Sequence, residues 1–281
     1  MYIDKVTNND LKEYIANCCA YSPEIDFDLA YKNTITYFKH HNGKKHNPND
    51  MFEIHRMFSI WYESLIENPQ NPNYSVYDDP YYMLEVWLCW VNYSRRYLKN
   101  IQNPKSMFGI SIADDMRKSG LNSILDLGCG SGYTTAAFKE IFPTCSVYGT
   151  NFETSVQYKM SSDLSKKIGF TMLPNHLSIR NIDLIFASEY FEHILDPIKH
   201  LSDIIFTCNP KYFIIANTFT SPAIGHFDYY NHGNTRLEGR KMSLKFNEFL
   251  RKLGYERMKT NCWNNRPSYW KRKDFIALEN T

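Results

Sequence analysis

The stretch Ser123-Ile-Leu-Asp-Leu-Gly-Cys-Gly-Ser-Gly-Tyr133 decides the fold of this chain of 281 residues. Its first five residues predict a short buried strand, and residues 133–142 place apolar side chains at helical spacing. The loop between them has glycine at every second position. Such a loop lies where open α/β sheets bind ligands, and glycine lets the backbone approach a ligand closely. The stretch therefore predicts a site for a small, adenosine-like ligand.

The spacing of the glycines excludes two common nucleotide-binding loops. The dinucleotide fingerprint Gly-x-Gly-x-x-Gly requires a third glycine where this chain has Tyr133, and no Gly-Lys-Ser/Thr ending follows for a phosphate-binding loop. Asp126 stands two positions before the first glycine. An acid at that place is ill suited to a polyphosphate but suits a ligand with an ammonium group and a sulfonium.

Three later segments follow the loop in an order that is typical of one family. Residues 146–151 and 211–218 predict strands, and residues 182–189 form the near-continuous apolar run of a strand buried on both faces. The segment Tyr190-Phe-Glu-His-Ile-Leu-Asp-Pro197 comes directly after that run. Together with the glycine loop, these segments resemble class I S-adenosylmethionine-dependent methyltransferases of the small-molecule type, over roughly residues 106–281.

The resemblance implies an α/β fold with S-adenosylmethionine as the cofactor. The expected architecture is a Rossmann-like, seven-stranded, mostly parallel sheet whose last strand is antiparallel, preceded by a helical N-terminal region. Residues 1–104 would form that region, a lid that recognises the substrate, and residues 105–281 would form the cofactor-binding domain. The last two strands are expected at 254–260 and 275–278, with a hairpin over 264–270 between them.

The resemblance also assigns cofactor contacts, position by position. These fall on Asp126, Gly128, Cys129, Gly130, Gly132, Tyr133, Asn151, Phe152, Ser188 and Glu189. Asn151 stands where the family usually has an acid that binds both ribose hydroxyls. An amide cannot accept two hydrogen bonds from hydroxyls as a carboxylate can, and Glu153 is the alternative for that contact.

The first third of the chain is predicted to form a set of helices. They are expected over residues 10–19 with Asp10 as the N-cap, 28–38, 51–66 and 81–98. Aromatic side chains are dense here and would serve either as the lid or as core: Trp61, Tyr62, Tyr81, Tyr82, Trp87, Trp90 and Tyr93. For Trp61 and Trp87 the helical spacing favours core.

Composition narrows the class of protein. A net charge of +2 is too small to indicate a polyanionic partner, and 43% hydrophobic residues allow a substantial core. The seven cysteines include no Cys-x-x-Cys pair, and no apolar run reaches the roughly 18 residues that span a bilayer. These features predict a cytoplasmic protein without a membrane partner.

Methyl transfer to a hydroxyl requires a base, and histidine suits that role at neutral pH. His193 follows the fourth strand and is the first candidate, with a structural role at a helix entry as the alternative. His226 and Tyr229 lie in the loop 225–233, which is expected to face the active site; a metal site with Glu192 is a less favoured interpretation of that loop. Lys271-Arg272-Lys273 is expected to be a solvated hairpin shoulder and not a contact to nucleic acid.

The leading hypothesis is an enzyme that O-methylates a small metabolite, a sugar or a natural-product intermediate, with a histidine as general base. A nucleic-acid methyltransferase is the second hypothesis. A non-catalytic partner subunit that binds S-adenosylmethionine is the third, suggested by Asn151 in the acid position.

Overall fold

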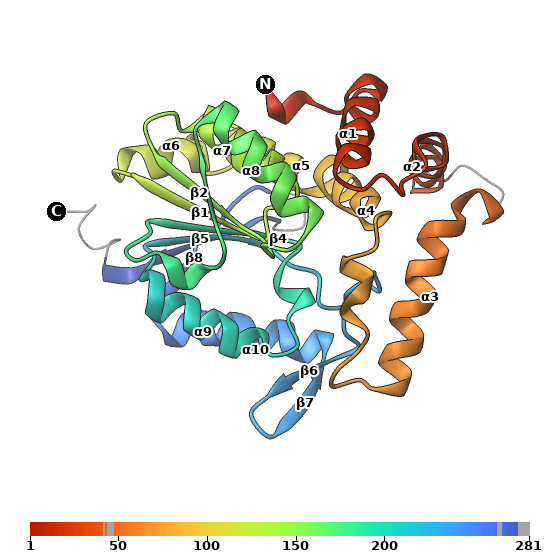
Figure 1. The fold of residues 1–281 in the computed structure, drawn as a ribbon. Coiled ribbons are helices and arrows are strands. Elements are labelled where there is room, and N and C mark those ends of the chain that lie inside the picture. The colour runs from red at the N-terminus through yellow and green to blue at the C-terminus, as the bar shows by residue number, and fades with distance from the viewer. Residues whose placement is uncertain (42, 44–47, 263–265, 275–281) are drawn as a thin grey trace.

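The computed structural model describes residues 1–41, 43, 48–262 and 266–274. Within these residues, seven strands form one sheet in the order β3-β2-β1-β4-β5-β9-β8 (Figure 1). The strands are β1 Ser123–Leu127, β2 Ser146–Thr150, β3 Thr171–Leu173, β4 Leu184–Ser188, β5 Tyr212–Ala216, β8 Tyr255–Arg257 and β9 Ser268–Arg272. The five strands β1, β2, β3, β4 and β5 are parallel to one another, and β9 is antiparallel to both β5 and β8. The predicted fold class is confirmed.

The central strands are buried because helices cover both faces of the sheet. β4 and β5 are almost wholly apolar, as strands between two helical layers must be. Figure 1 shows one layer on each face: α6 Ile112–Lys118, α7 Tyr133–Ile141 and α8 Val156–Ile168 on one, and α9 Pro197–Cys208 and α10 Gly239–Lys252 on the other. Asp183 joins the starts of β1 and β5, since its carboxylate accepts from the backbone N–H of Asn122 at 2.8 Å and pairs with Lys211 at 2.8 Å.

The C-terminal part of the sheet differs from the expectation. The last strand, β9, occupies residues 268–272, where the prediction placed a hairpin loop; the predicted strand 275–278 lies outside the described residues. Lys271 is 3% exposed and forms an ion pair with Asp115 of α6 at 2.9 Å. The expected solvated shoulder is therefore wrong for Lys271, because its charge is matched inside the protein.

The N-terminal region is helical, as predicted, and gathers on one side of the sheet (Figure 1). Its main helices are α1 Asn8–Tyr21, α2 Phe27–His41, α3 Phe52–Glu67, α4 Tyr82–Cys89 and α5 Arg95–Gln102. The single helix expected over 81–98 is a continuous run in which the π-helical turn η4, Trp90–Ser94, joins α4 to α5. The N-cap of α1 is Thr7 and not Asp10, because the two side chains form a capping box in which Asp10 is the third helical residue.

A small hairpin follows β5, in a part of the chain that the sequence pattern assigned to a loop. It consists of β6 Tyr229–His232 and β7 Thr235–Glu238. Gly233 lies in the turn between the two strands. Its φ of +57° is the left-handed conformation that such a tight turn requires. No helix in the described part of the chain is long and apolar enough to cross a membrane.

Candidate functional site

The glycine loop between β1 and α7 needs glycine for two reasons. Gly128, Gly130 and Gly132 all have positive φ, at +62°, +59° and +86°. A Cβ on Gly128 would lie 2.5 Å from the ring of Tyr190, and one on Gly130 would lie 2.9 Å from Cγ1 of Val86. Val86 belongs to α4, so the N-terminal region packs directly on the loop.

Helix α1 also holds the loop. The hydroxyl of Tyr14 lies 3.0 Å from Oγ of Ser131 and donates to the carbonyl of Met83 at 2.9 Å. The ring of Tyr133, the first residue of α7, makes edge contacts with Tyr2, Tyr14, Trp87 and Trp90. The loop and the N-terminal helices therefore form one continuous wall.

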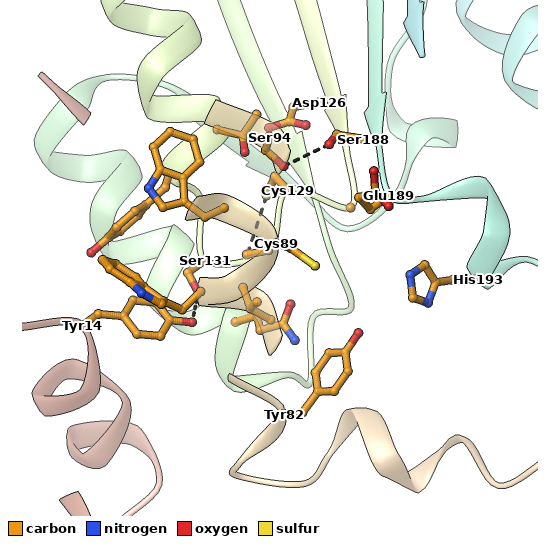
Figure 2. A pocket seen from close by; sticks show the side chains of 18 residues that line it. Tyr14, Tyr82, Cys89, Ser94, Asp126, Cys129, Ser131, Ser188, Glu189 and His193 are labelled. Carbon is orange, nitrogen blue, oxygen red and sulfur yellow. Dashed lines mark hydrogen bonds between the residues drawn. The ribbon is translucent and has the colours of Figure 1, made fainter. Parts of the chain in front are cut away.

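This wall encloses a cavity beside the loop, here called the glycine-loop cavity. It lies between α4 and η4 on one side and the ends of β1 and β4 on the other (Figure 2). Seven of the residues predicted to contact the cofactor line it: Asp126, Gly128, Cys129, Gly130, Tyr133, Ser188 and Glu189. Gly132, Asn151 and Phe152 are not among its lining residues. Its other polar side chains include Tyr14, Ser94, Ser131 and Gln157.

Asn151 stabilises the glycine loop through side-chain hydrogen bonds and does not itself line the cavity. Its amide nitrogen donates to the carbonyl of Gly130 at 3.1 Å and to Oε1 of Gln157 at 3.0 Å, and its oxygen accepts from the backbone of Phe152. Phe152 itself is 70% exposed. Gln157, which Asn151 positions, is the residue of this group that reaches the cavity.

Asp126, at the end of β1, is 2% exposed. Its carboxyl accepts a hydrogen bond from Oγ1 of Thr135 at 2.7 Å. Burial raises the pKa of Asp126 to about 7, and the Thr135 hydroxyl acts in the opposite direction. The folded protein therefore holds this proton at a pH where the unfolded chain, with a carboxyl pKa of 3.8, has lost it.

This difference predicts a dependence of stability on pH. Between about pH 4 and pH 7 the folded state binds more protons than the unfolded state, so the free energy of unfolding falls as pH rises. Asp126→Asn removes this contribution, and at pH 8 the variant is expected to be more stable than the wild type by on the order of 2–4 kcal/mol. Urea denaturation from pH 5 to pH 8 measures the difference.

Asp163→Asn is the matched control for that prediction. Asp163 lies on α8, and its side chain is 48% exposed. The control is expected to keep the pH dependence of the wild type. An Asp126→Asn protein whose unfolding free energy changes with pH as steeply as that of the wild type would contradict the prediction.

A second cavity adjoins the first and is called the histidine cavity. The two share Tyr82, Cys89, Glu189 and His193 as lining residues. The N-terminal helical region provides one side of the histidine cavity, and the segment after β5 provides much of the other. Its remaining polar or aromatic lining residues include Tyr37, Phe58, Glu85, Asn92, Tyr93, Thr218, Ser221, His226 and Arg266.

The structure brings His193 and His226 together in this cavity. Their rings meet edge to face with centroids 4.6 Å apart. Nδ1 of His226 donates to the carbonyl of Ser221 at 2.7 Å, which leaves Nε2 as an acceptor. Burial lowers the pKa of His226 to about 4, and burial together with His226 lowers the pKa of His193 well below its usual value. Both rings are therefore neutral at pH 7.

Tyr77 fixes the position of the His193 ring. It ends the short helix η3, Tyr74–Tyr77, and its hydroxyl lies 2.9 Å from Nδ1 of His193. The same hydroxyl donates to the carbonyl of Gly225 at 3.5 Å. No local sequence pattern singles out Tyr77, because its partners lie 116 and 148 residues further along the chain.

Two carboxyl groups lie at the end of β4. Glu189 has φ +50° and accepts a hydrogen bond from the Tyr97 hydroxyl at 2.9 Å. Glu192 lies in the short helix η6, Phe191–His193, is fully buried, and accepts from the backbone of Thr218 at 2.7 Å. Burial raises the pKa of both, and Glu189 raises that of Glu192 further. Glu192 is therefore a neutral acid beside an ionisable Glu189.

Tyr229 lies apart from these groups. It is 50% exposed on β6, and the guanidinium of Arg236 covers its ring at 5.3 Å. It lines neither cavity. Within the described ranges, no group of three or more His, Cys, Asp or Glu side chains is placed to hold a metal ion.

Comparisons with known proteins give one family match. A family model described as a methyltransferase domain matches residues 90–264, more than half of the chain, and begins inside the expected N-terminal region. No curated protein matches the chain.

Solved structures that match parts of the chain include three methyltransferase-related proteins. Monomeric WbdD is 16% identical over 56% of this chain and 38% of its own, with a TM-score of 0.39, so the match spans well under half of WbdD. An S-adenosylmethionine-dependent methyltransferase from Clostridium acetobutylicum is 12% identical over 57% and 88%, with a TM-score of 0.39. The mitomycin 7-O-methyltransferase MmcR is 11% identical over 79% and 67%, with a TM-score of 0.45.

Proposed function

The chain belongs to the methyltransferase-domain family, and on this premise we propose that it transfers a methyl group from S-adenosylmethionine to a hydroxyl of a small polar acceptor. The observation that supports the proposal is the meeting of two cavities at His193 and Glu189. One cavity lies against the glycine loop and would hold the cofactor. The other contains the paired histidines and would hold the acceptor.

The lining of the glycine-loop cavity fits the proposed cofactor. Asp126 and Glu189 provide carboxyl groups, and Trp87, Trp90 and Tyr133 provide aromatic rings. None of its lining residues in the described part of the chain is a lysine or an arginine. Such a wall suits a ligand with an aromatic base and two cationic groups, and disfavours a polyphosphate. When bound, S-adenosylmethionine supplies the methyl group from a positively charged sulfur.

A side chain of the histidine cavity would then accept the proton of the acceptor hydroxyl. We assign the base to Nε2 of His193, with the Nδ1 hydrogen donated to Tyr77 and the Tyr77 hydrogen donated to the carbonyl of Gly225. The lowered pKa of His193 keeps the ring neutral at pH 7, so its Nε2 has a free lone pair. Enclosure of the ring between the N-terminal helices and the sheet keeps water from competing with the acceptor.

Binding and turnover test the proposal separately. The purified protein is expected to bind S-adenosylhomocysteine in a calorimetric titration. It is also expected to transfer label from methyl-labelled S-adenosylmethionine to a hydroxyl compound within a panel of sugars and phenols. No heat with either the methyl donor or its product would contradict the proposed cofactor. Tight binding without turnover of any panel member would support a non-catalytic partner subunit instead.

A further inference from the structure

The histidine cavity carries an acidic group whose charge nothing in its wall offsets. Its lining includes two glutamates, Glu85 and Glu189, and one arginine, Arg266. Arg266 lies close enough to Glu189 to lower its pKa, against the larger opposite effect of burial. The two histidines of the wall are neutral, as described above. Glu85 therefore remains the uncompensated acid of the cavity.

Glu85 is also short of hydrogen bonds. It lies on α4, and its Oε1 is buried with no hydrogen-bond partner; Nδ2 of Asn92, on η4, is in the same condition. Glu85 is half-buried beside the cavity, and a carboxylate oxygen that is buried there without a partner is costly, a cost that an apolar side chain would avoid. An acid kept in such a place points to a partner that is not part of the chain.

The surroundings of Glu85 suit a cation. Aromatic rings of Tyr37, Phe58, Tyr82 and Tyr93 line the same cavity. Burial raises the pKa of the Tyr37 and Tyr82 hydroxyls, and the nearby Glu85 carboxylate raises it further, so Glu85 lies among these rings. A carboxylate beside aromatic rings is an arrangement that can bind an ammonium group, since both attract positive charge.

We propose that the acceptor of this cavity carries a protonated amine as well as its hydroxyl, and that Glu85 is the carboxylate that pairs with that amine. The inference rests on the proposed function, because it names the substrate class of the same site: a hydroxylated alkyl amine such as an amino sugar or a phenol with an aminoalkyl chain. Burial alone raises the pKa of Glu85 to about 7. An ammonium group that binds beside the carboxyl group acts in the opposite direction and favours the charged carboxylate. An anionic acceptor would meet Glu85 and Glu189 and is disfavoured.

The test uses matched probes that differ only at the amine. Tyramine, N-acetyltyramine and 4-hydroxyphenylethanol form one set, and glucosamine, N-acetylglucosamine and glucose form the other. Each is added to the full chain with S-adenosylhomocysteine present, and the melting temperature and the dissociation constant are measured. At least one amine is expected to bind, at least about ten-fold more tightly than its N-acetyl and hydroxyl counterparts.

Glu85→Gln is expected to abolish this preference while the response to S-adenosylhomocysteine stays unchanged. The control is Glu63→Gln, on the exposed part of α3, which is expected to behave as the wild type. Without ligand, Glu85→Gln is expected to melt at the same temperature as the wild type or higher at pH 8, because it removes an unpaired charge.

Three results would overturn the inference while leaving the proposed function intact. They are failure of every amine in the panel to bind, equal binding of the neutral counterparts, and a lower melting temperature of ligand-free Glu85→Gln, which would mean that Glu85 has a structural partner. If the wild-type protein shows no response to S-adenosylhomocysteine, that result would instead contradict the proposed function.

Discussion

His193→Ala is expected to lower kcat by about 10²–10⁴-fold, the range that a positioned general base contributes. The affinity for S-adenosylhomocysteine is expected to stay within about three-fold of the wild type, because the glycine loop, Trp87 and Asp126 remain in place. Labelled methyl transfer measures kcat, and a calorimetric titration measures the affinity. The two readouts separate loss of a base from loss of the cofactor site.

Two further variants make the result specific. His193→Asn keeps a donor for the Tyr77 hydroxyl but has no titratable nitrogen, so it is expected to be as slow as the alanine variant. His55→Ala, at an exposed position of α3, is expected to retain full turnover. Turnover close to that of the wild type in His193→Asn would show that His193 only supports the structure.

Gly225→Ala is expected to damage both stability and turnover. Gly225 has φ +83°, and a Cβ there would overlap with the Tyr77 hydroxyl and lie 2.5 Å from Nδ1 of His193. The added methyl group must displace both of these side chains, and such overpacking costs about 1–3 kcal/mol on top of about 1 kcal/mol for the left-handed backbone. Displacement of His193 is expected to lower kcat by at least about ten-fold.

Gly169→Ala separates the backbone cost from the steric one. Gly169, the C-cap of α8, has φ +85°, but nothing lies within 4 Å of a Cβ built on it. This variant is expected to lose only about 1 kcal/mol and to keep its turnover. Urea denaturation and steady-state rates compare the two proteins. Equal losses of unfolding free energy would contradict the steric argument.

The sequence predicted those parts of the fold that local pattern encodes. The apolar run 182–189 and the glycine loop each carry their own signal, since burial on both faces and a positive φ restrict residue type directly. Strand β9 was missed because Lys271 reads as a surface residue. Its burial depends on Asp115, which lies 156 residues away in the sequence.

The candidate site shows the same division. His193 and His226 stood out because histidines after the strands of this fold face the ligand edge of the sheet. Tyr77 carried no such signal, and neither its spacing nor its neighbours distinguish it from the core aromatics around it. Glu85 did carry one: it is the acid in an otherwise apolar or aromatic helix, Tyr82-Met-Leu-Glu-Val-Trp-Leu-Cys89, and that departure from the pattern could have been noticed.

Helix α4 has a consequence for the thermodynamics of this protein. Val86 and Trp87 face the glycine-loop cavity, Glu85 and Leu88 face the histidine cavity, and Tyr82 and Cys89 border both. A ligand that shifts this one turn of helix reshapes the wall met by the other ligand. For the proposed donor and acceptor we therefore expect cooperative binding, and linkage requires that each change the affinity of the other by the same factor.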